Sequence, residues 1–377
     1  MAEIYLDNSA TTKPYLEVTT KIVKILTEVY GNPSSYHRLG QESRSMIELA
    51  RQLIAKSLSV KNDEIYFTSG GTESDNLAIK GACLANSKRG NRIVTTVAEH
   101  PAVIKTIRDL KRQGWEVEYV SAPRGELDLE ELDAAINERT VLVSAMLVNN
   151  ELGCIFPIEK IKQIIARKNS PALLHCDAVQ GYGKMDFTAA SIGADLISIS
   201  AHKIHGPKGI GALYVRNGVN MFSLNLGGGQ ENGLRSGTES TPLIAGFGEA
   251  VRLTFENRFE DQLHMLKLRD YCIKALLAGI PDVVINSSKF GAPHIVNFSL
   301  PGIPNREVVE YLSMRDIFIS SAAACKGNRS RGPSMLESLG LTRELADSAL
   351  RVSFSYMNSI QEVDLLVEAL VDFCQGK

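Results

Sequence analysis

A lysine beside a histidine and a serine follows a strand-like run of the sequence. Residues 194–199 are mostly apolar, and Ser200, Ala201, His202 and Lys203 come directly after them. A lysine held in a cleft loses hydration, which lowers its pKa and frees its amine to form a Schiff base with an aldehyde. The hydroxyl and imidazole beside it can hold a phosphate. A pyridoxal phosphate (PLP) enzyme needs this set, whereas an isolated lysine is more often a solvated surface residue.

A glycine-rich turn supplies a second candidate for phosphate binding. Residues 68–76 read Thr-Ser-Gly-Gly-Thr-Glu-Ser-Asp-Asn and separate a strand-like run from a helical one. Glycines let the backbone approach a ligand closely, and the amides that open a helix favour an anion. Such a turn alone is weak evidence, but together with Ser200 and His202 it predicts a complete phosphate site.

A carboxylate ends another apolar strand, at Asp177. In an α/β sheet this position faces the ligand crevice, and a buried carboxylate there needs a cationic partner such as a protonated pyridine nitrogen. A charged pyridine makes the cofactor an electron sink. Gln180, one helical turn later, is placed to donate to the ring oxygen. Asp177 is an equally good N-cap for a following helix, so the two interpretations stay open.

Three histidines need interpretation. His100 follows a strand and can stack on a planar ring, although a lone histidine is more often structural. His202 and His205 are three residues apart, but Lys203 is a poor ligand and no carboxylate stands at helical spacing. We therefore expect no metal site.

Cys325 differs from the other cysteines in its surroundings. It lies among small residues and glycines, with Lys326, Arg329 and Arg331 close behind, and nearby cations raise the thiolate fraction of a thiol. We expect a reactive Cys325 on a mobile, exposed loop. The remaining cysteines lie in apolar or helical contexts and are expected to pack in the core: Cys83, Cys154, Cys176, Cys272 and Cys374. The absence of a CxxC pair argues against disulfides and structural zinc.

Strand-like and helical runs alternate along the chain. The expected strands span 64–68, 92–97, 117–120, 141–148, 173–177 and 196–200, and the expected helices between them span 41–59, 102–113, 129–136 and 158–168. This order predicts a mostly parallel sheet covered on both faces. A long helix over 241–269 leads to a smaller α/β domain from about residue 258. That domain has expected strands at 295–299, 317–320 and 350–353 and helices at 305–314, 343–348 and 360–372.

Composition excludes several classes. The 377 residues are 44% hydrophobic and carry a net charge of −2. The sequence therefore shows neither the basic excess typical of nucleic-acid-binding proteins nor an acidic tail. No apolar run is long enough for a bilayer, and the N-terminal residues lack the pattern of a signal peptide. The protein is therefore expected in the cytoplasm. Without GxGxxG or GxxxxGK[ST], a dinucleotide-dependent dehydrogenase is disfavoured.

Taken together, the motifs closely resemble the cysteine desulfurases of the NifS/IscS class, which are class-V aminotransferase-type PLP enzymes. The resemblance covers essentially the whole chain, and several motifs occur in the right order. They are residues 5–12, 31–35, 68–76, 99–100, 148–153, 175–180, 200–203, 235–238 and 351–353.

The resemblance implies PLP fold type I, an α/β fold. The large domain, 14–257, would hold a mostly parallel, seven-stranded type of sheet. A small α/β domain would comprise 1–13 and 258–377 and carry the mobile cysteine loop at about 321–334. It also implies a homodimer that binds neither nucleic acid nor membrane.

It further implies residue roles. Lys203 would bond the cofactor aldehyde and shuttle the proton, Cys325 would attack the substrate sulfur, and His100 would stack on the ring. The remaining roles would be: Asp177 at the pyridine nitrogen; Gln180 at the ring oxygen; Gly71, Thr72, Ser200, His202 and the other subunit's Thr238 at the phosphate; Asn150 and Arg351 at the substrate carboxylate. L-Cysteine would become L-alanine, with sulfur passed through a Cys325 persulfide to an acceptor protein in iron–sulfur assembly or thiolation.

Two departures from the family pattern stand out. Ala322, Ala323 and Ala324 precede Cys325 where the family usually has Gly-Ser-Ala, and Asn232 stands where it usually has arginine. The nearest alternative functions are a selenocysteine lyase and a related fold-type I aminotransferase. An aminotransferase needs no cysteine on a mobile loop. A binding protein that keeps the fold without catalysis is a further alternative.

Overall fold

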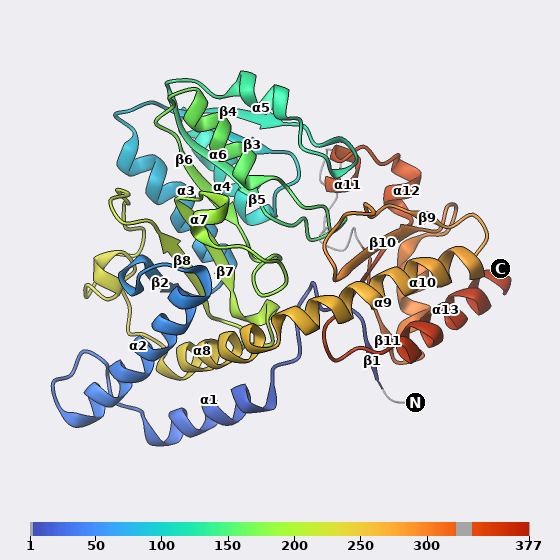
Figure 1. Cartoon of the computed structure of the whole chain (residues 1–377), viewed down its shortest axis with the longest axis horizontal. Coiled ribbons are helices and arrows are strands. Elements are labelled where there is room, and N and C mark those ends of the chain that lie inside the picture. Colours follow the sequence, from blue (N-terminus) through green and yellow to red (C-terminus); the bar gives the residue numbers. More distant parts are fainter. Residues whose placement is uncertain (1–2, 322–333, 377) are drawn as a thin grey trace.

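A seven-stranded sheet forms the centre of the larger part of the molecule (Figure 1). The computed structural model describes residues 3–321 and 334–376. In spatial order the strands are β2 (Ile65–Thr68), β8 (Gly211–Val215), β7 (Leu196–Ser200), β6 (Leu173–Asp177), β5 (Thr140–Met146), β3 (Arg92–Thr96) and β4 (Glu116–Val120). The strands β7, β6, β5, β3 and β4 run parallel to one another. β8 is antiparallel to both of its neighbours, β2 and β7. The expected α/β fold with a mostly parallel sheet is confirmed.

Strand β8 was not among the strands predicted from the sequence. It returns beside β7 after a short loop in which His205 and Gly209 adopt left-handed φ values of 60° and 82°. Gly211 begins the strand, and a Cβ there would lie 2.7 Å from the Cα of Gly70. β8 therefore runs against the glycine turn and holds it beside the end of β7.

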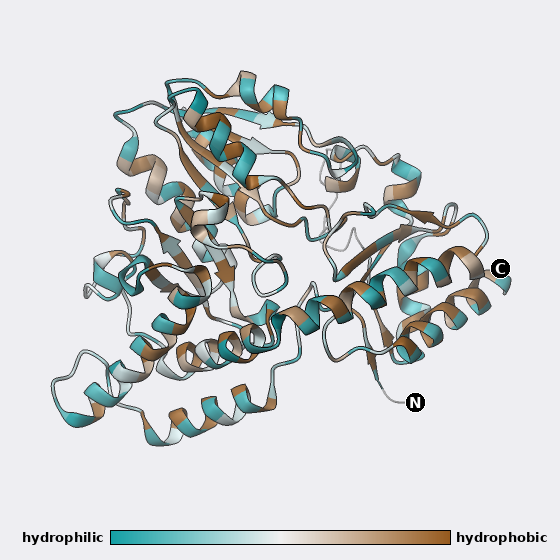
Figure 2. Cartoon of the chain, in the orientation of Figure 1, coloured by the Kyte–Doolittle hydropathy of each residue, from teal (hydrophilic) through white to brown (hydrophobic). Residues whose placement is uncertain are grey.

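Helices cover both faces of this sheet because its strands alternate their side chains between two apolar clusters. Leu196 packs with α3 and α4 in one cluster, while Ile197 and Ile199 pack with α6 and α8 in the other. Figure 2 shows the hydrophobic residues on the strands and on stripes of the helices. The helices of this part are α1 (Leu16–Glu28), α2 (Arg38–Leu58), α3 (Gly71–Asn86), α4 (Pro101–Arg112), α5 (Leu129–Ala135), α6 (Ile158–Arg167), α7 (Ala189–Ile192) and α8 (Thr241–Glu256), with 3₁₀ turns at η1 (Asn62–Glu64), η2 (Pro123–Gly125), η3 (Ala201–Lys203) and η4 (Glu231–Gly233).

The long helix expected over 241–269 is two helices. α8 ends at Glu256, Asn257 has φ −111° and ψ 9°, and α9 (Arg258–Gly279) continues ten residues beyond the predicted end. The prediction of one continuous helix is therefore wrong. The apolar residues of α8 and of α9 follow one another without a gap at Asn257, so the sequence pattern does not show the joint. Figure 1 shows α8 and α9 end to end, leading from the large sheet to the second part.

The second part has its own sheet and core. Its four strands, in the order β12 (Ser320–Ser321), β13 (Ala349–Ser353), β10 (Ile295–Ser299) and β9 (Val284–Ile285), pair antiparallel. β1 (Ile4–Tyr5) pairs in parallel with β11 (Ile317–Phe318). Apolar residues of these strands pack with α9, α10 (Asn305–Ser313) and α13 (Ile360–Gln375). The N-terminal residues Ile4 and Leu6 belong to this core.

Two short helices near the C-terminus pack elsewhere. Leu336 of α11 (Met335–Ser338) and Ala346 of α12 (Arg343–Asp347) join the core of the large sheet. The domain boundaries given above therefore remain a prediction. Among the described residues, no helix is both long and apolar enough to cross a membrane.

A buried ion pair fixes the loop around η4 to the large sheet. Both Nη atoms of Arg51 lie 2.9 Å from the carboxylate of Glu231, which also accepts the backbone N–H of Phe67 at 2.8 Å. The Glu231 side chain is 2% exposed and that of Arg51 11%. Because Glu231 and the following Asn232 both have φ near +50°, at 49° and 52°, this bond holds a turn that an unpaired chain would seldom adopt.

We predict that Glu231→Gln destabilises the fold by about 3–5 kcal/mol, because it removes the buried partner of Arg51 and leaves only the exposed Glu48 as a counter-ion. Urea unfolding measures the change. Glu48→Gln is the matched control: Glu48 also pairs with Arg51, at 3.1 Å, but its side chain is 54% exposed, so the cost should be at most about 1 kcal/mol. Equal losses in the two variants would contradict the assignment.

Candidate active site

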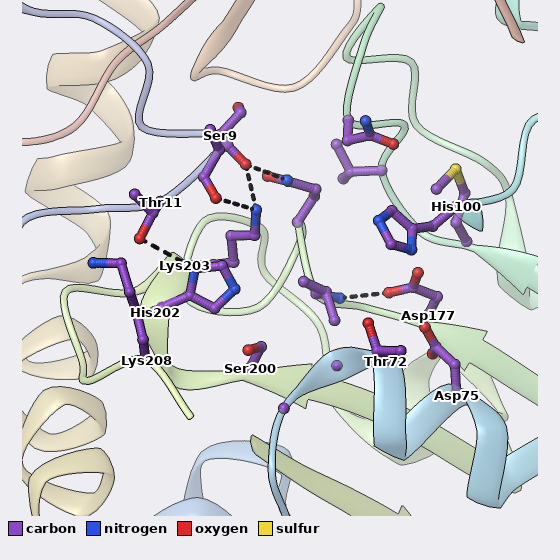
Figure 3. A pocket seen from close by; sticks show the side chains of 18 of the residues that line it. Ser9, Thr11, Thr72, Asp75, His100, Asp177, Ser200, His202, Lys203 and Lys208 are labelled. Atoms are coloured by element: carbon purple, nitrogen blue, oxygen red, sulfur yellow. Dashed lines mark hydrogen bonds between the residues drawn. The ribbon is translucent and has the colours of Figure 1, made fainter. Parts of the chain in front are cut away.

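The side chains expected to do chemistry meet at the carboxyl edge of the large sheet, where a cavity of about 720 Å³ opens. Its wall combines the ends of β6 and β7, the start of α3, the turn after β5, and strands β12 and β13 of the second part. Figure 3 shows the centre of this cavity. The predicted residues that line it are Gly71, Thr72, His100, Asn150, Asp177, Gln180, Ser200, His202, Lys203 and Arg351.

Lys203 reaches into the cavity from η3, directly after β7. Its Nζ donates to the backbone carbonyl oxygens of Ser9 at 2.5 Å and Ala10 at 2.8 Å (Figure 3). Burial and the positive charge of Arg351 lower the pKa of the Lys203 amine to about 8, although Asp7, Asp177 and Glu151 oppose the change. About a tenth of this amine is therefore unprotonated at pH 7 and about half at pH 8, as Schiff-base formation requires.

Asp177 lies at the last position of β6 and is 5% exposed. One of its oxygens, Oδ1, accepts the backbone N–H of Val179 at 3.0 Å. The residues after it form turns and no helix, so the alternative of a helix N-cap is wrong. Burial raises the pKa of Asp177, and electrostatic interactions with His100 and Lys203, together with the Val179 N–H, oppose the rise. A cationic ligand group next to Asp177 would stabilise its ionised form.

Two further buried carboxyl groups lie close to Asp177. The carboxyl group of Asp75 points toward it (Figure 3), and Asp75 Oδ1 is buried without a hydrogen-bond partner. Burial, reinforced by the charge of Asp177, holds the pKa of Asp75 well above its usual value, and burial raises the pKa of Glu99 to about 8. His175, 3.6 Å from Asp75, supplies no charge, because burial lowers its pKa to about 3. We infer that Asp75 and Glu99 are neutral acids.

One end of the cavity, next to the start of α3, is suited to bind an anion. Gly70 has φ 150°, and a Cβ on Gly71 would lie 2.8 Å from Val179 Cγ2, so glycines are required for this close approach. The first amides of α3 and the Ser200 hydroxyl face the cavity, and Ser200 Oγ is buried without a partner. Such an unused donor marks a place for a ligand acceptor atom.

His202 and Lys208 complete that end (Figure 3). His202 Nδ1 lies 3.2 Å from Thr11 Oγ1. Burial and the charge of Lys203 lower the pKa of His202 to about 4, so its ring is neutral. Lys208 lines the same cavity and contributes a positive charge. Together with the glycine turn, these groups form a site suited to a phosphate.

His100 and Gln180 occupy the middle of the cavity. His100 is the N-cap of α4, and its Nδ1 accepts the backbone N–H of Ala102 at 3.1 Å. Burial lowers its pKa, so the ring is neutral and its proton resides on Nε2. Gln180 Nε2 donates to the Ser9 carbonyl at 2.8 Å, while its Oε1 is buried and unpaired. The Nε2 group has a second N–H, so it can donate to a ring oxygen while it keeps the Ser9 contact; this expected bond remains a prediction.

Arg351 and Asn150 approach from the side of the second part. Arg351 Nη1 donates to the Asn150 carbonyl at 2.8 Å, and its Nη2 contacts Asp7 Oδ1 at 2.9 Å. Nη1 also lies 3.2 Å from Glu151 Oε1. The guanidinium suits a carboxylate ligand, but two carboxylates of the chain itself already contact it.

Among the described residues, one predicted residue does not line this cavity. Thr238 is exposed on the loop after η4 and lies away from the cavity of its own chain. Cys325 lies outside the described residues, as do Ala322, Ala323 and Ala324.

Several residues that contribute to the site were not predicted from the sequence. Asp75 and Glu151 lie inside the motifs 68–76 and 148–153, so their carboxyl groups could have been noticed there. Lys208 follows the lysine motif by five residues. The carbonyl groups of Ser9 and Ala10 are backbone atoms and left no signal in the side-chain pattern.

Comparisons with known proteins define the family. The model of the aminotransferase class-V family matches residues 4–366. The chain is 41% identical over 373 residues to a cysteine desulfurase IscS of Clostridium botulinum, covering 98% of this chain and 93% of that protein. A solved NifS-like protein superimposes with a TM-score of 0.94 at 37% identity over the whole of both chains. A NifS-like protein from Rickettsia africae gives 0.89 at 30% identity, covering 99% and 100%. The chain belongs to the aminotransferase class-V family.

This family depends on pyridoxal 5'-phosphate, and the cavity fits that group. The unpartnered Ser200 hydroxyl and the glycine turn match a phosphate, and the buried carboxyl of Asp177 matches a pyridinium nitrogen. Lys203 provides an amine of lowered pKa for the aldehyde. The donor set therefore agrees with the cofactor at three separate points.

We predict that Asp75→Asn stabilises the cofactor-free protein by on the order of 1 kcal/mol at pH 8 and leaves it unchanged near pH 3. Folding raises the pKa of Asp75. The resulting loss of folding stability is therefore absent below the pKa of this carboxyl in the unfolded chain, and it appears as the pH rises above that pKa. Thermal unfolding across this range measures the difference. Asp63→Asn, at an exposed position, is the control and should show none. A loss of stability in Asp75→Asn that grows with pH would show that Asp75 is ionised.

Proposed function

We propose that this protein is a PLP-dependent cysteine desulfurase. It converts L-cysteine to L-alanine and transfers the sulfur through Cys325 to an acceptor protein. Its membership of the class-V family and its 41% identity to proteins named cysteine desulfurase support this assignment. The observation that carries it is the buried Lys203 amine, which shares one cavity with Asp177 and Arg351.

Three groups divide the work of binding. Thr72, Ser200 and the first amides of α3 would hold the phosphate, and Asp177 would pair with the pyridine nitrogen. Arg351 and Asn150 would hold the substrate carboxylate at the opposite end. When bound, PLP supplies an electron sink for the pair released at Cα of the substrate. Lys203 Nζ, free of the cofactor once the substrate amine has replaced it, would take the Cα proton.

The sulfur step belongs to Cys325. Its thiolate would attack the substrate sulfur, so that an S–S bond forms as the Cβ–S bond breaks. The electron pair of the broken bond stays with the substrate carbon. Protonation at Cβ would then complete the methyl group, and return of the proton from Lys203 Nζ to Cα would complete alanine. Ser321 lines the cavity, and Cys325 follows it by four residues, a span of at most about 14 Å. That span supports Cys325 as the nucleophile.

A homodimer completes the phosphate site in this proposal. Thr238 is exposed and lies outside the cavity of its own chain, which supports its contribution to a second copy. The acceptor of the sulfur is an iron–sulfur scaffold or a thiolation enzyme. Neither kind of acceptor protein is needed for the release of alanine when a small thiol reduces the persulfide.

We predict that the cofactor-free protein forms its Schiff base with PLP at a rate that rises with pH to half its maximum near 8, because burial lowers the pKa of Lys203 to about 8. The growth of the yellow absorbance measures this rate. In Lys203→Ala the exposed lysines should react only as the pH approaches about 10, and the buried Lys184, whose pKa is also lowered, does not line the cavity. The same profile in both proteins would remove Lys203 from this role.

The proposed function is tested by assaying alanine and sulfide released from L-cysteine by wild-type protein and by Cys325→Ser. We predict a yellow wild type that forms both products with a reducing thiol, and a yellow Cys325→Ser variant at least a hundredfold slower. Cys83→Ser, at a buried position far from solvent, is the matched control and should stay active.

The other outcomes separate the alternatives. A yellow variant that remains fully active would reassign the nucleophile and favour an aminotransferase. Faster turnover of L-selenocysteine, retained in Cys325→Ser, would identify a selenocysteine lyase. A wild-type protein that binds no PLP would refute the enzyme assignment.

A further inference from the structure

The substrate-binding arginine is already engaged by the chain's own carboxylates. Arg351 is 5% exposed in β13, and its two terminal nitrogens contact Asp7 and Glu151 at 2.9 and 3.2 Å. On the proposed function, the substrate carboxylate must bind this same guanidinium. A ligand that enters therefore has to displace one of the two.

The hydrogen bonding around Arg351 is incomplete in a way that fits a ligand. Arg351 Nε, Asn150 Oδ1 and Glu151 Oε2 are each buried without a partner. Glu151 is 8% exposed, and its other oxygen accepts Asn150 Nδ2 at 2.7 Å. Unpaired buried polar atoms are costly, and the only donor among these three is Arg351 Nε. A ligand carboxylate would pair with it, since carboxylates accept from Nε and one Nη of an arginine, whereas a proton taken up by Glu151 would make that carboxyl group a donor.

Of the two carboxylates, Glu151 is the one that a ligand can displace from Arg351. Asp7 follows β1 and is tied to the second part by a backbone bridge to Ser353. Glu151 projects from the turn after β5 on a longer side chain, and within residues 3–321 and 334–376 its carboxylate is held only by Arg351 and Asn150. Three carboxylates around one guanidinium would leave excess negative charge in a buried place.

We propose that Glu151 occupies the position of the substrate carboxylate on Arg351 in the free enzyme, and that it leaves this position and takes up a proton when the amino acid binds. Glu151 is thus a positioning residue. It keeps the guanidinium oriented toward the cavity until the substrate carboxylate replaces it.

The electrostatics of the cluster support this exchange. Burial and the charge of Asp7 raise the pKa of Glu151 to about 7, although Arg351 and Lys203 oppose the rise. Loss of the contact with Arg351 removes the main opposing charge, so the pKa of the displaced carboxyl rises further. The other titratable groups near Arg351 in the described part of the chain are Tyr5, Lys184 and His294. Burial raises the pKa of Tyr5 to about 12 and lowers the pKa of Lys184 and of His294, so none of the three supplies the lost charge at pH 8.

The test is calorimetric titration of the holoenzyme with 3-mercaptopropionate, which is cysteine without its amino group and so cannot exchange with the lysine. Titration at pH 8 in two buffers of different ionisation enthalpy gives the protons taken up per ligand bound. The proteins are wild type, Glu151→Gln, Glu151→Asp and Glu64→Gln. Glu64 is the matched control, because it too is 8% exposed but does not line the cavity.

Wild type and Glu64→Gln should take up close to one proton, and their affinity should fall by nearly tenfold for each pH unit above 8. Glu151→Gln should take up none and change its affinity by less than about twofold over that range. Glu151→Asp, which keeps a titratable carboxyl, should retain the uptake. Binding by wild type without proton uptake, or with the same uptake in Glu151→Gln, would overturn the proposal.

Failure of the proposed function gives a different result. If wild type does not bind 3-mercaptopropionate, the exchange at Arg351 is refuted, and the alanine and sulfide assay then decides separately whether the protein is a desulfurase. If wild type releases alanine yet shows no linked proton, only the role of Glu151 is refuted.

Discussion

Desolvation of ionisable groups at the carboxyl edge of the large sheet is the constraint on which the site depends. It lowers the pKa of the Lys203 amine to about 8 and raises the pKa of Glu151 to about 7 and of Glu99 to about 8. In each case burial is the largest cause, and neighbouring charges only modify it. A cavity of this kind binds ligands that restore missing charge or hydrogen bonds, because each restored contact removes part of a cost already present in the fold.

The N-terminal segment joins the two parts of the molecule at this site. Asn8 donates to the Ser353 carbonyl at 2.8 Å, and Thr12 donates to the His202 carbonyl at 3.0 Å. Between these anchors, the carbonyls of Ser9 and Ala10 accept from Lys203, 194 and 193 residues away in the chain. The position of the reactive amine therefore depends on strand β7 in one part and on a segment fixed to β13 in the other. A shift between the two parts would change the hydration of Lys203 and hence its pKa.

The sequence predicted what local patterns encode. Strands that end in a functional group are short apolar runs, so Asp177 and Lys203 could be placed at the edge of a parallel sheet before any contact was known. Three features could not be predicted in this way. β8 has an apolar run like the others, but its antiparallel return depends on left-handed residues in the loop before it. The helix break at Asn257 lies within an unbroken apolar pattern. The engagement of Arg351 by Asp7 joins residues 344 apart, and no local pattern reports such a contact.

On the proposed function, the two ends of the cavity use different physical means to bind anions. At the end proposed for phosphate the donors would be the amides of α3, the Ser200 hydroxyl and the neutral ring of His202, with Lys208 near by. Fixed dipoles of this kind need no counter-ion when the ligand is absent. At the substrate end the donor is a full positive charge on Arg351, which cannot remain buried alone and so has carboxylates of its own chain as partners. The phosphate end can therefore keep one arrangement with and without its ligand, whereas the substrate end must exchange one anion for another. It follows that discrimination between amino acid and other small anions rests on the exchange at Arg351, because only a carboxylate of matching geometry replaces what it removes.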